Sequence, residues 1–112
     1  MMKKTLSTIS FIFVSSGAFS AEWIEANLNQ IEIAGAGVLE GLYFAKDSPY
    51  QTSFSCSLNR YISIRGDQKL ADRALSLALY AKTTPAKLKI YVVGCDAQGY
   101  LEGKQVMLSS QP

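Results

Sequence analysis

The chain has 112 residues, with 11 Lys and Arg, nine Asp and Glu, two Cys, no His and a net charge of +2. That length suffices for one small domain. Without His, a His-containing catalytic triad and a histidine metal site are excluded, and two Cys cannot form a four-thiolate zinc site. The composition therefore favours a binding protein over an enzyme.

The surplus positive charge lies at the N-terminus. Residues 1–4 include two lysines, residues 6–14 form a short apolar run, and residues 15–21 are mostly small. This is the pattern of a bacterial secretory signal peptide, with a core helix as the alternative, and the apolar run is too short to span a bilayer. We expect residues 1–21 to be the export signal, with cleavage after Ser20 as the alternative, and residues 22–112 to be a single periplasmic or secreted domain.

Removal of the signal also removes two lysines, Lys3 and Lys4. Of the 11 positive side chains, nine then remain against nine negative ones. Nucleic-acid binding depends on a surplus of Lys and Arg along the phosphate backbone. We therefore expect no nucleic-acid partner, and we also expect no membrane insertion.

Export determines the redox environment of the two cysteines, Cys56 and Cys95. In an oxidising compartment, a single disulfide is the default expectation. It would close a loop of about 40 residues and contribute roughly 3–4 kcal/mol to stability. A catalytic thiol is the alternative, but the chain has no His to activate it.

The first half of the mature chain alternates between apolar and polar residues. Residues 24–28 and 31–33 alternate in opposite phases, which predicts one strand with a β-bulge. The glycines in residues 34–37 predict a turn, and residues 38–44 predict a second strand. The polar segment 46–55 predicts an exposed loop.

The second half predicts a strand, a helix and a final pair of strands. Residues 61–65 form the strand, with their two isoleucines facing inward. Asp67 is a good N-cap for a helix over residues 68–82. Residues 87–95 and 100–108 are the last two strands.

The predicted helix carries more apolar surface than one contact needs. Its apolar residues cover well over half of the circumference, whereas a helix lying on a small barrel needs about a 100° stripe. This surplus indicates a second burial partner, with a loosely amphipathic, Ala-rich helix as the alternative. The polar residues form one stripe: Lys69, Asp72, Arg73, Ser76 and Tyr80.

The order strand, strand, strand, helix, strand, strand predicts a mainly β protein with one helix, of the α+β class. In about 90 residues, this order and a bulged first strand match the OB-fold, a five-stranded Greek-key barrel. The disulfide would then join the segment entering the third strand to the end of the fourth.

No catalytic group of residues is found. The closely spaced carboxylates are Glu22 with Glu25, and Asp67 with Asp72. Asp67 is explained as a helix cap and Asp72 by its place near the helix N-terminus. We predict no enzymatic activity, no cofactor and no metal site.

Carbohydrate binding remains, because OB-folds also bind oligosaccharides. One loop and its flanks combine aromatic rings, which suit the apolar face of a sugar, with short polar side chains for its hydroxyls. The alternative is that the two tyrosines merely cover the barrel end. The predicted glycan-binding residues are Tyr43, Asp47, Tyr50, Gln51, Ser53 and Asn59.

Four segments of the chain together carry a resemblance to a known family. They are Ala21-Glu22-Trp23 after the signal, Phe54-Ser55-Cys56-Ser57, Leu77-Ala78-Leu79-Tyr80-Ala81 at the helix end, and Lys87-Leu88-Lys89-Ile90-Tyr91-Val92. With these segments the mature chain resembles the B subunits of pentameric bacterial toxins, most closely the subtilase cytotoxin and pertussis-type branch. It is shorter than those subunits, has one Cys pair where that branch often has two, and lacks the branch's long loop before the last strand.

The resemblance implies a ring pentamer with neighbouring sheets joined edge to edge and with cell-surface glycans, often sialylated, as ligands. A toxin A subunit would be a further partner. The helices would line a central pore, which Lys69, Arg73, Ser76 and Tyr80 would face. The alternative function is a monomeric periplasmic OB-fold protein that binds a small ligand or cation, or a stress or inhibitor protein.

Overall fold

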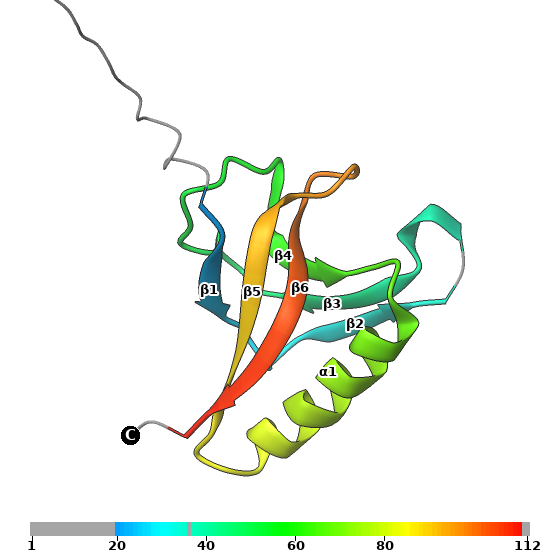
Figure 1. Cartoon of the computed structure of the whole chain (residues 1–112). Helices are drawn as coiled ribbons and strands as arrows, with labels where there is room; N and C mark the ends of the chain where they lie inside the picture. Colours follow the sequence, from blue (N-terminus) through cyan, green and yellow to red (C-terminus); the bar gives the residue numbers. More distant parts are fainter. Residues whose placement is uncertain (1–19, 36, 111–112) are drawn as a thin grey trace, which may run out of the picture.

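Figure 1 shows a computed structural model of the chain, which describes residues 20–35 and 37–110. All but the last two residues of the predicted export signal lie outside these ranges. The described part is mainly β with one helix, which confirms the predicted class. Its elements are β1 (Glu22–Glu25), β2 (Ile31–Ala34), the 3-10 turn η2 (Gly37–Leu39), β3 (Gly41–Ala45), β4 (Leu58–Ile64), α1 (Gln68–Lys82), β5 (Lys87–Cys95) and β6 (Tyr100–Ser109).

The strands form one six-stranded mixed sheet in the order β1-β5-β6-β4-β3-β2. The contact between β4 and β6 is parallel, and the other pairs are antiparallel. One face of the sheet packs a continuous apolar core. Its fully buried side chains include Phe44, Ile62, Leu88, Ile90 and Leu101. As predicted, the two isoleucines of β4 face inward, since both are buried.

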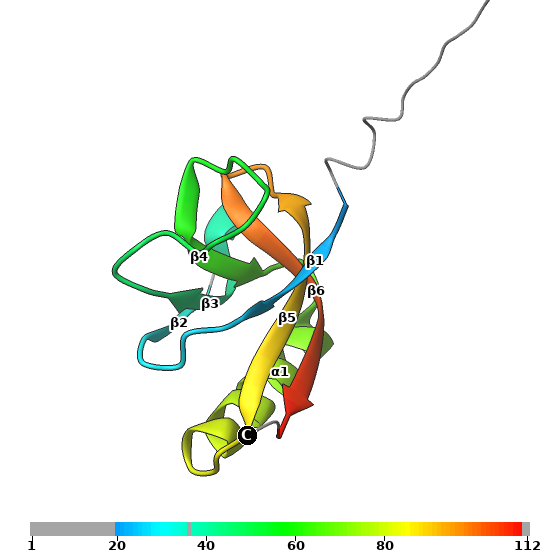
Figure 2. The same cartoon turned by 90° about the vertical axis from the view of Figure 1, so that its left-hand side faces the viewer.

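The first predicted strand is two strands, so the sheet has six where five were expected. β1 pairs with β5 at one edge of the sheet, and β2 pairs with β3 at the other. Only residues 26–30 join them, a distance of at most about 20 Å. The switch in the apolar–polar alternation after residue 28 therefore marks the point where the chain leaves β5 and pairs with β3. It does not mark a β-bulge within one strand, which is what the sequence pattern predicts. The two edges must therefore lie close together, and Figure 2 shows the chain bending from β1 into β2.

A buried tyrosine holds this bend in place. The Tyr50 hydroxyl donates to the Phe44 carbonyl at 3.0 Å and accepts from the Asn27 N–H at 3.1 Å. The Asn27 side-chain amide in turn donates to the Ala45 carbonyl at 2.6 Å. Burial raises the pKa of Tyr50 to about 12, so the hydroxyl stays protonated near neutral pH. The predicted loop over residues 46–55 is a loop, but Tyr50 turns inward from it.

The helix α1 begins and ends where the sequence predicts. The Asp67 side chain accepts from the Leu70 N–H at 3.0 Å, which confirms the N-cap. The helix contacts β3, β5 and β6, and Figure 1 shows it lying along one side of the sheet. All five polar-stripe residues are exposed. The buried residues of the helix are all alanines: Ala71, Ala74, Ala78 and Ala81.

The second predicted strand starts at Gly41 rather than at residue 38, because the residues before it form the turn η2. The carbonyls of Val38 and Leu39, in the turn η2, accept hydrogen bonds from the side chains of Arg65 and Tyr43. β3 then begins at Gly41, where the chain passes so close to the end of β4 that a Cβ would lie 2.6 Å from Arg65 Cγ. A side chain at this position would force the two segments apart.

The predicted disulfide is present between Cys56 and Cys95, whose Cα atoms are 5.4 Å apart. Cys56 precedes β4 and Cys95 ends β5, so the bond joins the segments that were predicted. A hydrogen bond of 2.9 Å from the Leu58 N–H to the Gly99 carbonyl reinforces the same junction.

Replacing both cysteines by serine should lower the free energy of unfolding by about 4 kcal/mol, because the bond closes a span of 39 residues in the unfolded chain. Urea denaturation of the double variant, and of the reduced wild-type protein, measures this loss. A double variant within about 1 kcal/mol of wild type would contradict the expectation.

Tyr50→Phe should lower the free energy of unfolding by about 1–3 kcal/mol, because it removes both hydrogen bonds of the hydroxyl and leaves the Asn27 N–H without its acceptor. The matched control is Tyr80→Phe on α1, where the ring is 57% exposed. This control should change stability by less than about 0.5 kcal/mol. Equal effects of the two substitutions would show that the buried hydroxyl does not hold the bend.

Candidate functional site

The face of the sheet opposite the core carries a row of polar and aromatic side chains. Glu32 on β2 lies opposite Tyr43 on β3, and Tyr43 lies opposite Ser63 on β4. Ser63 pairs in turn with Glu102 on β6. Because side chains alternate along a strand, the residues next to this row on β3 and β4 point into the core. The register thus assembles an outer face from four strands.

Three tyrosines cluster on this outer face. The ring of Tyr43 lies 5.1 Å from that of Tyr100 and 6.5 Å from that of Tyr61, and the last two are 5.5 Å apart. All three contacts are edge-to-face, the arrangement that aromatic rings prefer. Tyr43 is buried, whereas Tyr61 and Tyr100 are half-buried. We call these three residues the tyrosine cluster.

An open pocket of about 150 Å³ lies against the tyrosine cluster. Its remaining walls include Glu32 and Ile33 of β2 and Leu39 of the turn η2. The Tyr43 hydroxyl donates to the Leu39 carbonyl, so the turn is attached to the cluster. Burial raises the pKa of Tyr43, as do Tyr100 and the carboxylates of Asp96 and Glu32, against the opposing effect of Arg65. The pocket therefore combines aromatic walls with one carboxylate, that of Glu32.

A buried ion pair supports the cluster from behind. Arg65 Nη1 lies 2.7 Å from Asp96 Oδ2, and the side chains are only 18% and 7% exposed. The Ser63 hydroxyl donates to the same oxygen at 2.9 Å. The other carboxylate oxygen accepts from the N–H groups of Gln98 and Tyr100 at 2.9 and 3.0 Å. Asp96 thus fixes the turn between β5 and β6, which carries Tyr100.

These contacts change the ionisation of Asp96. Burial alone would raise the pKa of its carboxyl group, but the donors from Arg65, Ser63, Tyr100 and Gln98 outweigh burial and hold the pKa below its usual value. Asp96 is therefore an ionised, fully bonded structural group rather than an acid or base poised for catalysis.

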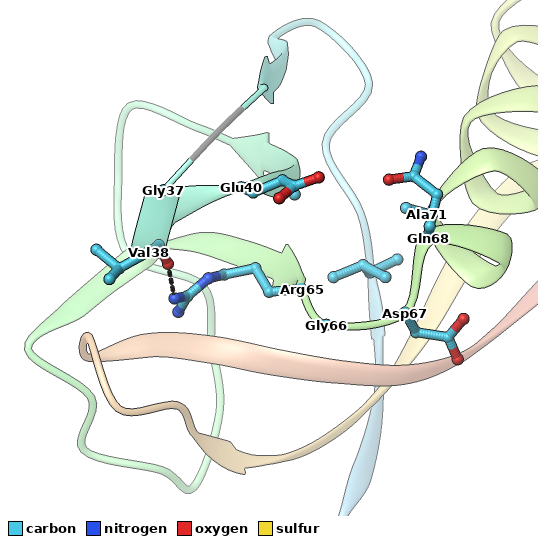
Figure 3. Close-up of a pocket in the computed structure, with 10 residues that line it drawn as sticks. Gly37, Val38, Glu40, Arg65, Gly66, Asp67, Gln68 and Ala71 are labelled. Atoms are coloured by element: carbon cyan, nitrogen blue, oxygen red, sulfur yellow. Dashed lines mark hydrogen bonds between the residues drawn. The ribbon is translucent and has the colours of Figure 1, made fainter.

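A second hollow, of about 420 Å³, lies near the start of α1 (Figure 3). In this view Arg65 reaches away from the helix toward the Val38 carbonyl, to which it donates. The carboxylate of Asp67 accepts the N-cap hydrogen bond. The Arg65 Nε is buried without a hydrogen-bond partner and is not presented to the hollow. Arg65 and Asp67 are thus committed elsewhere, and Glu40 is the remaining charged residue among the described ones that line the hollow. Because none of these lining residues is aromatic, the tyrosine-walled pocket is the better candidate for binding.

The structure does not gather the six predicted glycan residues into one pocket. Tyr43 belongs to the tyrosine cluster, whereas Tyr50 is buried with its hydroxyl bonded to backbone. The hydroxyl and N–H of Ser53 donate to the carboxylate of Glu22 at 2.6 and 3.0 Å, and lower its pKa. Gln51 is exposed in the loop.

The other two predicted residues, Asp47 and Asn59, line a separate open hollow of about 490 Å³. Tyr61 lines both this hollow and the tyrosine-walled pocket. The sequence interpretation missed Tyr61, Tyr100 and Glu32. Strand alternation places Tyr61 and Tyr100 opposite the core, but only the register shows that they meet Tyr43.

Neither a transmembrane helix nor a cluster suited to a metal ion is found within residues 20–35 and 37–110. Comparisons of the chain with protein-family models, with curated proteins and with solved structures gave no match. The functional argument therefore depends on the geometry of this chain.

Asp96→Asn should lower stability at neutral pH, because it removes the charge that Arg65 faces. Because the folded-state pKa of Asp96 is lowered, its stabilising contribution is complete above the unfolded value of about 3.9 and is lost as pH falls through the folded value. The gap between wild type and variant should therefore shrink between about pH 5 and pH 2.

Urea denaturation at a series of pH values measures this gap. Asp47→Asn, a change in the exposed loop, controls for the altered net charge. A gap that stays constant from pH 7 to pH 2 would contradict the assignment of the ion pair as a stabilising contact.

Proposed function

We propose that this chain is an exported, non-enzymatic binding module with an OB-fold, which assembles into a ring and binds glycans as toxin B subunits do. The observation that carries this proposal is the surface of α1. The helix buries its alanines against its own sheet, three of its leucines pack only partly against the core, and Leu79 is largely exposed. Exposed apolar side chains that lie together on a surface favour contact with a partner that removes them from water.

The sheet order supports the OB-fold. The two N-terminal strands can be regarded as halves of one bent strand, with each half pairing at a different edge of the sheet. The parallel pair of β4 and β6 and the helix between β4 and β5 fit the same barrel. The disulfide is compatible with an exported protein.

Apolar side chains on both sides of α1 support assembly of several copies. Leu70 and Leu77 flank the alanine face on one side, and Leu75 and Leu79 flank it on the other. Leu79 is 55% exposed. A helix with apolar residues on both flanks can contact two neighbours, as a closed ring requires. The polar stripe then lies away from the sheet, and Lys69, Arg73, Ser76 and Tyr80 would face the pore, where a toxin A subunit would bind.

Unpaired strand edges support the same assembly. Within the described residues, β2 pairs only with β3, and β6 beyond Glu102 pairs only with β5. Unpaired edges carry free N–H and C=O groups that favour pairing with another chain. Ile33 on β2 is 67% exposed, and Met107 on β6 is 38% exposed. Each edge thus has apolar side chains that a neighbouring copy would cover.

The outer face supports binding rather than catalysis. Its most buried charges, on Arg65 and Asp96, neutralise each other. Its open part combines tyrosine rings and aliphatic side chains with the carboxylate of Glu32, and these groups suit the apolar face and the hydroxyls of a sugar.

Light scattering of the purified protein should give the mass of a ring, expected to contain five protomers. Leu79→Glu and Met107→Glu should each shift this mass toward the monomer, because a charge would be buried at the interface. Since both side chains are exposed in the single chain, the melting temperature of the monomer should fall by only a few degrees.

Gln98→Glu is the matched control, because it adds the same charge at an exposed position in the turn between β5 and β6. Its mass should equal that of wild type. A wild-type protein that stays monomeric in concentrated solution would exclude the ring and favour a monomeric periplasmic protein.

A further inference from the structure

We propose that the tyrosine-walled pocket binds one neutral pyranose ring at the end of a glycan, and that it discriminates against sialic acid. This inference rests on the proposed glycan binding and specifies where it occurs and with which class of sugar. It differs from the expectation of sialylated ligands that the toxin resemblance implies.

The walls of the pocket fit the apolar face of a sugar. Tyr61 and Tyr100 are half-buried, so each is supported on one side and keeps part of its ring open to the pocket. Their edge-to-face contact at 5.5 Å, and the contacts of both with Tyr43, hold the rings in place. Rings that are already ordered lose little conformational entropy when a ligand binds. The volume of about 150 Å³ suits a single ring rather than an extended segment.

Glu32 supplies the polar contact that sugar hydroxyls require. It lies directly opposite Tyr43 in the register and forms part of the pocket wall. One of its carboxylate oxygens accepts from the Gln30 side-chain amide at 2.6 Å, which orients the group. An ionised carboxylate has about four acceptor positions, so it can still accept from the hydroxyls of a sugar.

The charges around the pocket favour a neutral ligand. Glu32 is the charged residue that lines the pocket, whereas two other carboxylates of this face are paired, Asp96 with Arg65 and Glu102 with Lys104. Among the described residues, Arg65 is the one cation that contacts a ring of the tyrosine cluster, that of Tyr100. Its guanidinium group is already bonded to Asp96 and to the Val38 carbonyl. A sialic acid carboxylate would meet Glu32 in a pocket whose lining residues, among those that the structure describes, include no Lys or Arg to pair with it, which disfavours its binding.

The neighbouring hollow extends this site. Tyr61 lines it together with Asp47 and Asn59, so a second sugar could continue past the Tyr61 ring. Lys46 and Arg60 belong to this second hollow and are not among the residues lining the tyrosine-walled pocket. An anionic glycan held by these two cations would therefore bind in a different place and would not depend on Glu32.

The test uses protein purified from a bacterial host that expresses and exports the full chain. A glycan array should carry neutral oligosaccharides ending in galactose, glucose, mannose or N-acetylglucosamine, each beside its sialylated counterpart. We expect binding to a neutral glycan at least about tenfold tighter than to its sialylated form. Titration calorimetry with the best neutral ligand then gives its Kd.

Two substitutions locate the site. Tyr61→Ala should raise the Kd of the neutral ligand by at least about tenfold, because it removes an aromatic ring on which the sugar stacks. Glu32→Gln should raise the Kd of the neutral ligand by a smaller factor. It should also bring the Kd values of the neutral and sialylated ligands closer together, because the negative charge that repels sialic acid is removed. A purely structural role of Glu32 would not change that gap.

The matched control is Tyr91→Ala. Tyr91 on β5 packs against Trp23 with ring centroids 5.1 Å apart, and it forms a second aromatic pair outside the pocket. Its loss should leave the Kd unchanged. Light scattering and circular dichroism of each variant confirm that mass and fold are retained, so that weaker binding reflects the site itself.

The outcomes separate this inference from the proposed function. Sialylated ligands that bind as tightly as neutral ones, or binding that survives Tyr61→Ala and is lost in Tyr91→Ala, would overturn the pocket assignment and leave glycan binding standing. Failure of every glycan on the array to bind correctly folded protein would overturn both.

Discussion

The short connection between β1 and β2 is the constraint on which the rest of the structure depends. It joins opposite edges of one sheet through residues 26–30, so the sheet must curl until these edges are close. The Tyr50 hydroxyl and the Asn27 side chain hold the bend by bonding to the backbone of β3. A curled sheet has one enclosed face, which becomes the core, and one convex face. Both the apolar core and the outer tyrosine cluster follow from this closure.

The outer face is rigid because several contacts converge behind it. Asp96 accepts hydrogen bonds from two side chains of β4 and its flank and from two N–H groups of its own turn. The disulfide is formed by the preceding residue, Cys95, and joins the turn to the start of β4. Arg65 and Asp96 neutralise each other beneath the face. The open part of the face is therefore largely aromatic, and Glu32 lies in its wall. Stacking and hydrogen bonds are the contacts that such a surface offers to a ligand.

The helix places small and large apolar residues at different positions around its circumference. Its alanines let it approach the sheet closely, because a methyl group needs little space. The same choice reduces the apolar area that the helix buries within its own chain and leaves the larger leucines at its flanks. A monomer would expose that area to water at a cost of about 25 cal/mol per Å². The free edges of β2 and β6 also carry unpaired N–H and C=O groups, and these two features together are the basis of the proposed self-association.

The sequence by itself determined the features that depend on near neighbours or on simple counting. The helix over residues 68–82, its Asp67 cap, the inward isoleucines of β4 and the single cystine all follow from local periodicity, capping and the presence of just two cysteines. Only the tertiary structure decided that the first strand changes partner, that Tyr50 turns inward, and that Tyr61 and Tyr100 meet Tyr43. These depend on register and sheet closure between residues far apart in the chain. Alternation reports which face a side chain occupies, but not which side chain lies beside it.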